Sequence, residues 1–427
     1  MEVKIWKELS SKEQEAALMR PAQASSDKIR EIVTSIISRI RKQGDTALFE
    51  YSKTLDKFEG ENIEWTAEEI SAACERVDAD LKKAIDTAYD NIAKFHAEQK
   101  PHHIKLETFP GIVCETHTHP IDSVGLYVPG GSAPLVSTAL MLAVPAKIAQ
   151  CPEVILCSPP PISDAIIYAA SKAGVKRIFN LGGAQAIAAM AYGTQSVPKV
   201  LKIFGPGNQF VTMAKRIVSN DAQGASIDMP AGPSEVLVIA SDSANPEYIA
   251  ADLLSQAEHG PDSQVILIAL SVEFANRVMQ KVDEQLEALP RKEIALKALS
   301  KSTALVVDTL DEAAELSNRY APEHLILQID DPDSLIGKLR NAGSIFVGAY
   351  TPESLGDYAS GTNHTLPTYG YAKTFSALGT DDYRRRYTIQ RASKEGLKEI
   401  SKTVTTMASA EGLDAHRNAV VVRVKDI

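Results

Sequence analysis

An adjacent glutamate and histidine, Glu323 and His324, are the residues of this chain best suited to proton transfer. An imidazole titrates near neutral pH, and a carboxylate beside it offers a second proton acceptor. The pair follows Pro322, between a predicted helix at 311–320 and a predicted strand at 325–329. Neighbouring strand residues point to opposite faces, so both side chains reach one site only if the chain bends at Pro322. A loop pair without chemistry fits the pattern equally well.

Residues of the types that bind metals gather in the second half of the chain. Gln256 and His259 are three apart near the end of a predicted helix that Gly260-Pro261 terminates, so they share a face. A lone histidine at a helix end more often interacts with the helix dipole. Asp357, in the glycine-rich segment 356–364, and His416, near the end of the chain, would complete a set of nitrogen and oxygen donors suited to Zn²⁺. Spacing alone does not bring these four residues together.

Three glycine turns follow predicted strands in the middle of the chain: Gly130-Gly131, Gly182-Gly183 and Gly205-Pro206-Gly207. Glycine lets a backbone approach a pyrophosphate, and the next helix offers free N–H groups to its charge. The full GxGxxG pattern is absent, because Phe210 occupies the third glycine position. The turns therefore fit either a nucleotide site or simple tight turns. Beside them, Tyr127, Gln185 and Asn208 could contact a cofactor or only cap helices and loops.

The elements that must position these residues alternate between strands and helices. Short apolar runs at 123–128, 154–157, 177–181 and 200–204 predict one parallel sheet, and runs at 236–240, 264–269, 304–307, 325–329 and 344–347 predict another. We therefore expect an α/β fold of two Rossmann-like parallel-sheet domains, one inserted in the other, with helical N- and C-terminal extensions. The expected units are an extension at 1–24, a discontinuous catalytic and metal domain at 25–126 plus 237–381, a nucleotide domain at 127–236 and a dimerisation tail at 382–427. Within the tail, 419–424 reads as a strand.

Composition excludes several classes of function. The net charge of −10 argues against nucleic-acid binding, and the basic run at 384–386 reads as a solvated helix face or a small-anion contact. The sequence contains neither a membrane-spanning apolar stretch nor a signal-peptide core. The four cysteines have no CxxC spacing, which favours free thiols and a cytoplasmic location.

Longer motifs make the chain resemble the histidinol dehydrogenase family from end to end. They are VGLYVPGG (124–131), GGAQAI (182–187), IFGPGN (203–208), DMPAGPSEV (228–236), LSQAEHGPDSQ (254–264), APEHL (321–325), GDYASGTNH (356–364) and AEGLDAH (410–416). The resemblance implies a zinc-containing, NAD-dependent enzyme that oxidises histidinol to histidine through the aldehyde. One departure is His119, which stands where many relatives have arginine; it lies outside the catalytic motifs.

The resemblance also assigns roles to residues. It implies Glu323 and His324 as the catalytic pair. Because an imidazole titrates near the working pH, we expect His324 to be the general base, and we expect the Glu323 carboxylate to activate water. It implies one Zn²⁺ per subunit, with the ligands Gln256, His259, Asp357 and His416. It implies NAD contacts at Tyr127, Gln185 and Asn208. It implies substrate contacts at Ser234, Gln256, His259, His324, Asp357, Glu411 and His416, with His364 close by. In this family the tail completes the site of the other subunit, so a homodimer is expected.

Two rival interpretations come from other classes. An aldehyde dehydrogenase would need a nucleophilic cysteine beside the glycine turns, and none of the four cysteines has that context. A non-catalytic zinc or nucleotide-binding protein would not need the Glu323–His324 pair.

Overall fold

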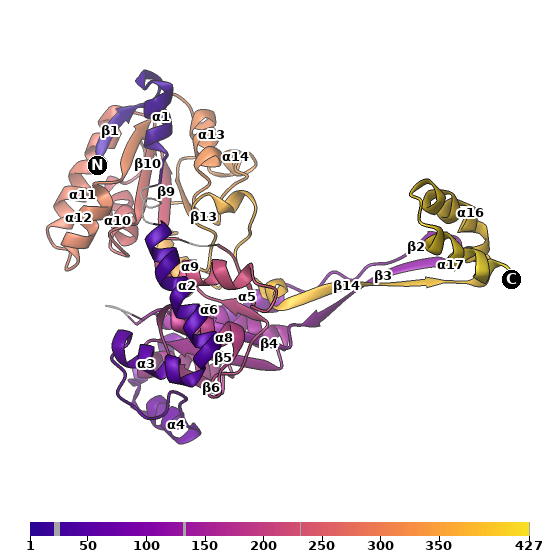
Figure 1. The fold of residues 1–427 in the computed structure, drawn as a ribbon. Helices are drawn as coiled ribbons and strands as arrows, with labels where there is room; N and C mark the ends of the chain where they lie inside the picture. The colour runs from indigo at the N-terminus through magenta and orange to yellow at the C-terminus, as the bar shows by residue number, and fades with distance from the viewer. Residues whose placement is uncertain (21–25, 131–133, 231, 427) are drawn as a thin grey trace.

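The computed structural model describes residues 1–20, 26–130, 134–230 and 232–426. Two parallel sheets, each covered by helices, form the body of the molecule, and a long antiparallel arm leaves it (Figure 1). Both parallel sheets have the strand order 3-2-1-4-5 when their own strands are counted along the chain, and the larger sheet gains one further edge strand. This arrangement confirms the predicted α/β class with two Rossmann-like sheets.

The smaller parallel sheet contains five strands in the order β6-β5-β4-β7-β8. They are β4 (Ser123–Tyr127), β5 (Glu153–Ser158), β6 (Arg177–Asn180), β7 (Lys202–Phe204) and β8 (Ser226–Ile227). The connecting helices are α6 (Val136–Ala149), α7 (Asp164–Lys172), α8 (Gly183–Tyr192) and α9 (Gln209–Ser219). All pairings are parallel, and β4 is buried along its whole length. The predicted strands at 123–204 are therefore confirmed.

The helices near the N-terminus cover both faces of this same sheet. They are α2 (Ser26–Gln43), α3 (Asp45–Leu55), α4 (Ala67–Arg76) and α5 (Ala79–Ala97). On one face, Val33 and Ile40 share a core with Phe179; on the other, Ile85 and Ile92 share a core with residues of β4. This packing differs from the expected grouping of 25–126 with 237–381. Helical periodicity shows that a helix buries one face, but it does not show which sheet receives that face.

The larger parallel sheet has the order β1-β11-β10-β9-β12-β13. Its strands are β1 (Glu2–Ile5), β9 (Glu235–Ala240), β10 (Gln264–Ala269), β11 (Thr303–Val306), β12 (His324–Gln328) and β13 (Ser344–Val347). Its helices are α1 (Ser11–Ala17), α10 (Pro246–Ala257), α11 (Val272–Leu286), α12 (Lys292–Leu299), α13 (Leu310–Tyr320), α14 (Asp333–Ile336) and α15 (Glu353–Tyr358). The N-terminal segment carries a helix, as expected, and also supplies β1, which pairs in parallel with β11.

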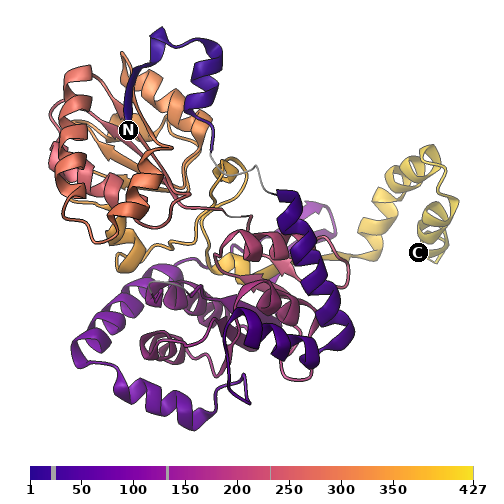
Figure 2. The same cartoon turned by 60° about the vertical axis from the view of Figure 1, so that its left-hand side comes forward.

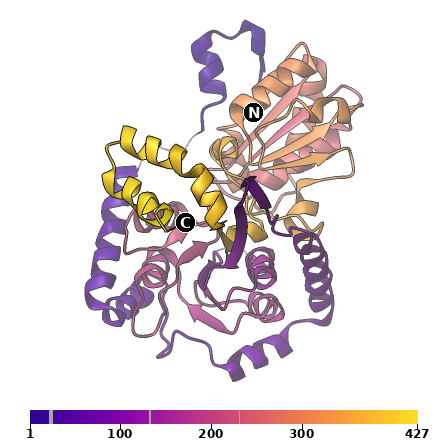
Figure 3. The same cartoon turned by 90° about the vertical axis from the view of Figure 1, so that its right-hand side faces the viewer.

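The arm consists of β2 (Lys105–Phe109), β3 (Ile112–Pro120) and β14 (Arg384–Ala392), paired antiparallel. It carries α16 (Lys394–Ala410) and α17 (Asp414–Val424) away from the body (Figures 1 and 2). Seen along the arm, these two helices stand in front of both lobes (Figure 3). Two expectations are corrected here: the basic run at 384–386 lies in β14 rather than on a helix, and the segment expected as a strand at 419–424 belongs to α17.

Three short 3-10 helices complete the described fold: η1 (Trp6–Glu8), η2 (Tyr371–Lys373) and η3 (Thr380–Tyr383). Within the described residues, no helix is both long enough and apolar enough to cross a membrane.

Candidate active site

The Glu323–His324 pair lies at the amino end of β12, where both side chains are buried. Ala321 adopts a left-handed backbone conformation with a φ of 55° immediately before Pro322. That bend brings His324 Nδ1 within 3.6 Å of Glu323 Oε2. The chain therefore bends next to Pro322, which both side chains need in order to reach one site.

The backbone of Glu235, the first residue of β9, contacts both members of the pair. Its N–H donates to Glu323 Oε2 at 2.9 Å, and its carbonyl oxygen lies 3.2 Å from His324 Nδ1. A carbonyl can only accept, so Nδ1 carries the proton of this bond. The other ring nitrogen of His324, Nε2, is buried without a hydrogen-bond partner among the described residues. It lies 3.6 Å from Asp357 Oδ1.

Three carboxylates surround His324 and determine its charge. Burial by itself lowers the pKa of His324, but the charges of Glu353, Glu323 and Asp357 outweigh it and raise that pKa well above its usual value. Burial likewise raises the pKa of Glu323 to about 8, although the neighbouring imidazole lowers it. Buried acid–base groups with displaced pKa values are characteristic of catalytic sites.

Glu353, in the first turn of α15, is a site residue that the sequence analysis missed. It is 1% exposed, and its Oε1 lies 3.7 Å from His324 Nδ1. Its other oxygen, Oε2, is buried with no hydrogen-bond partner among the described residues. Burial raises the pKa of Glu353 to about 8. The available signal was its position four residues before Asp357, which places both carboxylates on one helix face.

Two of the three expected ligands in the body come from the end of α10. Gln256 is fully buried, and its Nε2 donates to His259 Nδ1 at 3.0 Å, whereas its Oε1 has no partner among the described residues. Ligand atoms of His259, Glu353 and Asp357 all lie within 4.8 Å of one another. Surrounding atoms displace water from the His259 ring and lower its pKa, although the residue keeps one exposed side. The neutral imidazole that results is the form that binds metals.

The loop after α15 ties this cluster to the other lobe. His364 Nδ1 donates to the Asp357 carbonyl oxygen at 2.9 Å, so its Nε2 accepts from the Thr138 hydroxyl of α6 at 3.1 Å. Ser234, expected as a substrate contact, immediately precedes Glu235 and is partly buried. Ser234 is thus next in sequence to the residue that contacts the pair, and His364 contacts the backbone of Asp357.

The two expected site residues of the tail are not brought to this cluster by their own chain. Glu411 follows α16, and His416 lies in α17. Both helices stand at the far end of the arm, away from α10 and β12 (Figure 1).

The glycine turns lie at the carboxyl ends of the five-stranded sheet. Here β4 and β7 are neighbours at the point where the strand order reverses, the usual ligand position in such sheets. The Gly183 N–H donates to the Tyr127 hydroxyl at 3.0 Å, and Asn208 caps α9 by accepting from Phe210 and Val211. Gly131 and Ser132 lie outside the described residues.

Asp56, at the end of α3, is a second residue that the sequence analysis missed. Its Oδ2 accepts from the Gly182 N–H and from Gln185 Nε2, both at 3.0 Å. Burial raises the pKa of Asp56, and these two hydrogen bonds lower it again. Tyr127, Gln185 and Asn208 thus share one edge of the sheet, and each makes internal hydrogen bonds there.

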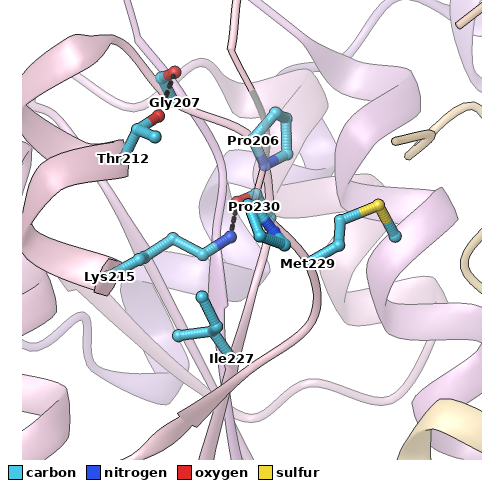
Figure 4. Close-up of a pocket in the computed structure, with 8 residues that line it drawn as sticks. Pro206, Gly207, Thr212, Lys215, Ile227, Met229 and Pro230 are labelled. Carbon is cyan, nitrogen blue, oxygen red and sulfur yellow. Dashed lines mark hydrogen bonds between the residues drawn. The ribbon is translucent and has the colours of Figure 1, made fainter. Parts of the chain in front are cut away.

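A buried ion pair between Lys215 and Asp228 holds the turn at Gly205. Figure 4 shows Lys215 beside this turn. Lys215 Nζ donates to the Gly205 carbonyl oxygen at 2.7 Å and lies 2.5 Å from Asp228 Oδ1, while the Gly205 N–H donates to Asp228 Oδ2 at 2.7 Å. Gly205 has a φ of +123°, and an added Cβ would meet the Tyr127 carbonyl oxygen at 2.1 Å. Only glycine fits this position.

The fold and the cluster define an α/β enzyme whose site combines acid–base groups with nitrogen and oxygen donors. The sequence profile described as histidinol dehydrogenase matches residues 19–424. The chain therefore belongs to the histidinol dehydrogenase family, whose members are oxidoreductases.

Individual relatives agree along the whole chain. A histidinol dehydrogenase from Vibrio parahaemolyticus is 56% identical over 427 residues, covering 100% of this chain and 99% of the relative. One from Campylobacter jejuni is 55% identical, with 100% of both chains covered. The crystal structure of histidinol dehydrogenase from Elizabethkingia anophelis matches with a TM-score of 0.96 at 46% identity, covering 100% of this chain and 98% of that one.

Proposed function

We propose that this chain oxidises L-histidinol to L-histidine through L-histidinaldehyde, in two NAD-dependent hydride transfers that complete histidine biosynthesis. The observation that carries this proposal is the buried Glu323–His324 pair beside Asp357, which lies in one cluster with His259 and Glu353. Membership of the histidinol dehydrogenase family supports the substrate.

His324 is the proposed general base of both oxidations. Its Nδ1 is held by the Glu235 carbonyl, so Nε2 is the nitrogen that accepts the hydroxyl proton of the substrate. The step starts from the neutral ring, so His324 must first release from Nε2 the proton that the surrounding carboxylates favour. The C–H bond of the alcohol carbon then breaks as hydride leaves, and a C=O bond forms. The Asp357 carboxylate, 3.6 Å from Nε2, stabilises the imidazolium produced. When bound at the edge formed by Tyr127, Gln185 and Asn208, NAD would supply the two-electron acceptor that each oxidation requires.

Glu323 acts between the two oxidations. Burial raises its pKa to about 8, so its carboxylate form is a stronger base than an exposed carboxylate, and the fraction in that form, which can take a proton from water, grows as the pH rises towards 8. The hydroxide equivalent adds to the aldehyde carbon while the carbonyl oxygen takes the proton held by the His324 imidazolium, which gives a gem-diol and returns His324 to its neutral form. His324 then removes a hydroxyl proton of the gem-diol as the second hydride leaves, which yields the carboxylic acid.

The donors at the cluster fit a zinc ion. Gln256 Oε1 and Glu353 Oε2 are buried oxygens without partners among the described residues, and His259 and Asp357 lie beside them. We propose Gln256, His259 and Asp357 as ligands of one Zn²⁺ per subunit, together with His416 of a second copy. When bound, the ion supplies an anchor for the imidazole and amino nitrogens of the substrate. Ser234, Glu411 and His364 are proposed as further contacts that orient the substrate.

The proposed cofactor site is the edge formed by Tyr127, Gln185 and Asn208, within the sheet unit 127–236 that α2–α5 cover. Binding there requires these side chains to exchange internal hydrogen bonds for bonds to NAD. The tail at 382–427 is proposed to reach the site of a second copy, because it projects from its own body (Figure 1). We infer a homodimer, and the four free thiols support a cytoplasmic location.

The rival cysteine mechanism finds little support at the thiols. Burial raises the pKa of Cys157, which lies in β5 near the glycine turns, far above its usual value, and it raises the pKa of Cys151 to about 11. A thiol held in its protonated form is a poor nucleophile.

The test of the proposed function counts NADH formed per histidinol consumed, with and without a metal chelator. Two NADH, abolished by the chelator and restored by Zn²⁺, supports the proposal; one NADH that stops at the aldehyde refutes the four-electron reaction. No NADH with tight zinc or nucleotide binding favours a non-catalytic protein. Glu323→Gln should retain alcohol oxidation while losing aldehyde oxidation, whereas His324→Asn should lose both; equal losses in the two variants refute the division of roles.

A further inference from the structure

Glu235 holds both groups of the catalytic pair through its backbone, so whatever fixes Glu235 also fixes them. Its N–H bonds Glu323 and its carbonyl bonds His324, at 2.9 and 3.2 Å. Its own side chain points elsewhere and is 2% exposed. A carboxylate buried to this degree needs a charged partner.

That partner is Arg20, from the segment that follows α1. Arg20 Nε donates to Glu235 Oε2 at 2.6 Å and Nη2 donates to Oε1 at 2.7 Å, which is a two-pronged contact. The planar guanidinium fixes direction as well as distance in such a contact, which a lysine ammonium does not. The Arg20 side chain is 16% exposed, so little water competes for the pair.

Arg20 also contacts the turn that leads into β12. Its Nη2 donates to the carbonyl oxygens of Tyr320 and Ala321, at 2.8 and 3.3 Å. Ala321 is the left-handed residue that turns the chain into Glu323 and His324. A non-glycine residue keeps that conformation only when its surroundings hold it. The guanidinium therefore contacts both segments that meet at the catalytic pair: β9 through the Glu235 side chain, and the turn before β12 through the Tyr320 and Ala321 carbonyl oxygens.

The Tyr320 ring completes the arrangement. The guanidinium carbon of Arg20 lies 3.9 Å from the ring centroid. The Tyr320 hydroxyl lies 3.2 Å from Glu235 Oε2 and 2.8 Å from Gln264 Oε1, so its proton is shared between two buried acceptors. The Glu235 carboxylate is thus held from two sides.

We propose that Arg20 is a positioning residue for catalysis: from the N-terminal segment it locks the β9 backbone and the turn at Ala321, and thereby aligns Glu323 and His324. The proposal rests on the roles proposed above for those two residues. Arg20 itself is not among the proposed substrate or metal contacts. Its loss should therefore lower turnover without changing ligand affinity.

The test compares Arg20→Lys and Arg20→Gln with a matched control, Arg76→Lys. Arg76 makes the same two-pronged contact with Asp164, at 2.8 and 2.7 Å, but on the exposed surface between α4 and α7. Arg20→Lys keeps the charge and removes the fork, and it should lower kcat for both half-reactions about tenfold to a hundredfold. KM for histidinol and for NAD, and zinc content, should stay within about twofold, as for Arg76→Lys.

Two further measurements keep the test decisive. If Arg20→Gln fails to fold, as near-UV circular dichroism would show, Arg20→Lys carries the comparison alone. The NMR signal of the His324 Nδ1 proton should shift in Arg20→Lys and not in Arg76→Lys. Equal kcat in these two folded variants, or a rise in KM with kcat unchanged, overturns the proposal. Absence of NADH from the unmodified chain would refute the proposed function instead, while the NMR comparison still tests the positioning.

Discussion

Replacing Lys215 with methionine should lower the Tm of the chain markedly, because Lys215 holds the turn at Gly205 beside the five-stranded sheet. Lys215 and Asp228 are 5% and 1% exposed, and between them they bond the N–H and the carbonyl of Gly205. Methionine keeps most of the side-chain volume, so the main change is loss of charge. Asp228 then remains as a buried, unpaired carboxylate.

Removing one partner of a buried ion pair costs about 3–5 kcal/mol. For a domain of roughly 150–250 residues each kcal/mol lowers the Tm by about 2–4 °C, so Lys215→Met should lose about 6–20 °C. Displacing the Gly205 carbonyl should also weaken NAD binding. A loss of about 1.4 kcal/mol, the size of one good hydrogen bond, raises Kd roughly tenfold.

The assay is thermal unfolding followed by circular dichroism, with NAD titrated by calorimetry below the transition. A double variant, Lys215→Met with Asp228→Asn, removes the unpaired charge and keeps one acceptor for Gly205, so it should regain part of the lost stability. Arg76→Met, which breaks an exposed pair, should change little. The reasoning fails if Lys215→Met melts like Arg76→Met, or if the double variant is no more stable than the single one.

Three further predictions concern the catalytic cluster. Burial raises the pKa of Glu323 from 4.5 to about 8, so the folded, metal-free chain keeps a proton that the unfolded chain has released. This contribution to the free energy of unfolding is fully present below about pH 4.5 and is lost as the pH rises through about 8. In urea unfolding between pH 6 and 9, Glu323→Gln should therefore lose less stability with rising pH than the unmodified chain does. Glu353→Gln should lower the affinity for Zn²⁺ about 10–100-fold in competition with a chelator, and an unchanged affinity would mean that Glu353 serves His324 alone. A refolded equal mixture of inactive His324→Ala and His416→Ala chains should regain about a quarter of normal activity, because half of the dimers carry one intact site. Activity no higher than that of either variant alone would show that His416 is not shared.

Much of the fold was predictable because strand, glycine turn and helix leave a strong pattern. The strand at 123–128 and the turn at Gly205 were both recognisable in the sequence. The destination of the helices at 26–97 was not, because an apolar stripe such as that of Val33 and Ile40 fits either sheet. The apolar run at 419–424 fits a strand or a helix equally well, and in the structure it is an exposed helix.

The residues of the site also differ in how far the sequence could predict them. The Glu323–His324 pair was visible as adjacent residues of suitable chemistry, whereas its support by Glu235 depends on β9 and β12 being neighbours across 88 residues. Glu353 escaped notice because a glutamate in a short helix usually faces water. Its burial follows from the packing of α15 against α10, which no local pattern shows.

The pairing of β1 with β11 joins two strands that are synthesised far apart in time. Glu2 pairs with Thr303, and Arg20 needs Glu235 and Tyr320 for its contacts. At a synthesis rate of about 5–20 residues per second, the first strand waits roughly 15–60 s on the ribosome for its partner. The five-stranded sheet can fold during that delay, but the N-terminal segment cannot be placed until most of the chain has emerged. Residues 1–20 are thus ordered later than the five-stranded sheet, and the Arg20 contacts form only after Tyr320 has been synthesised.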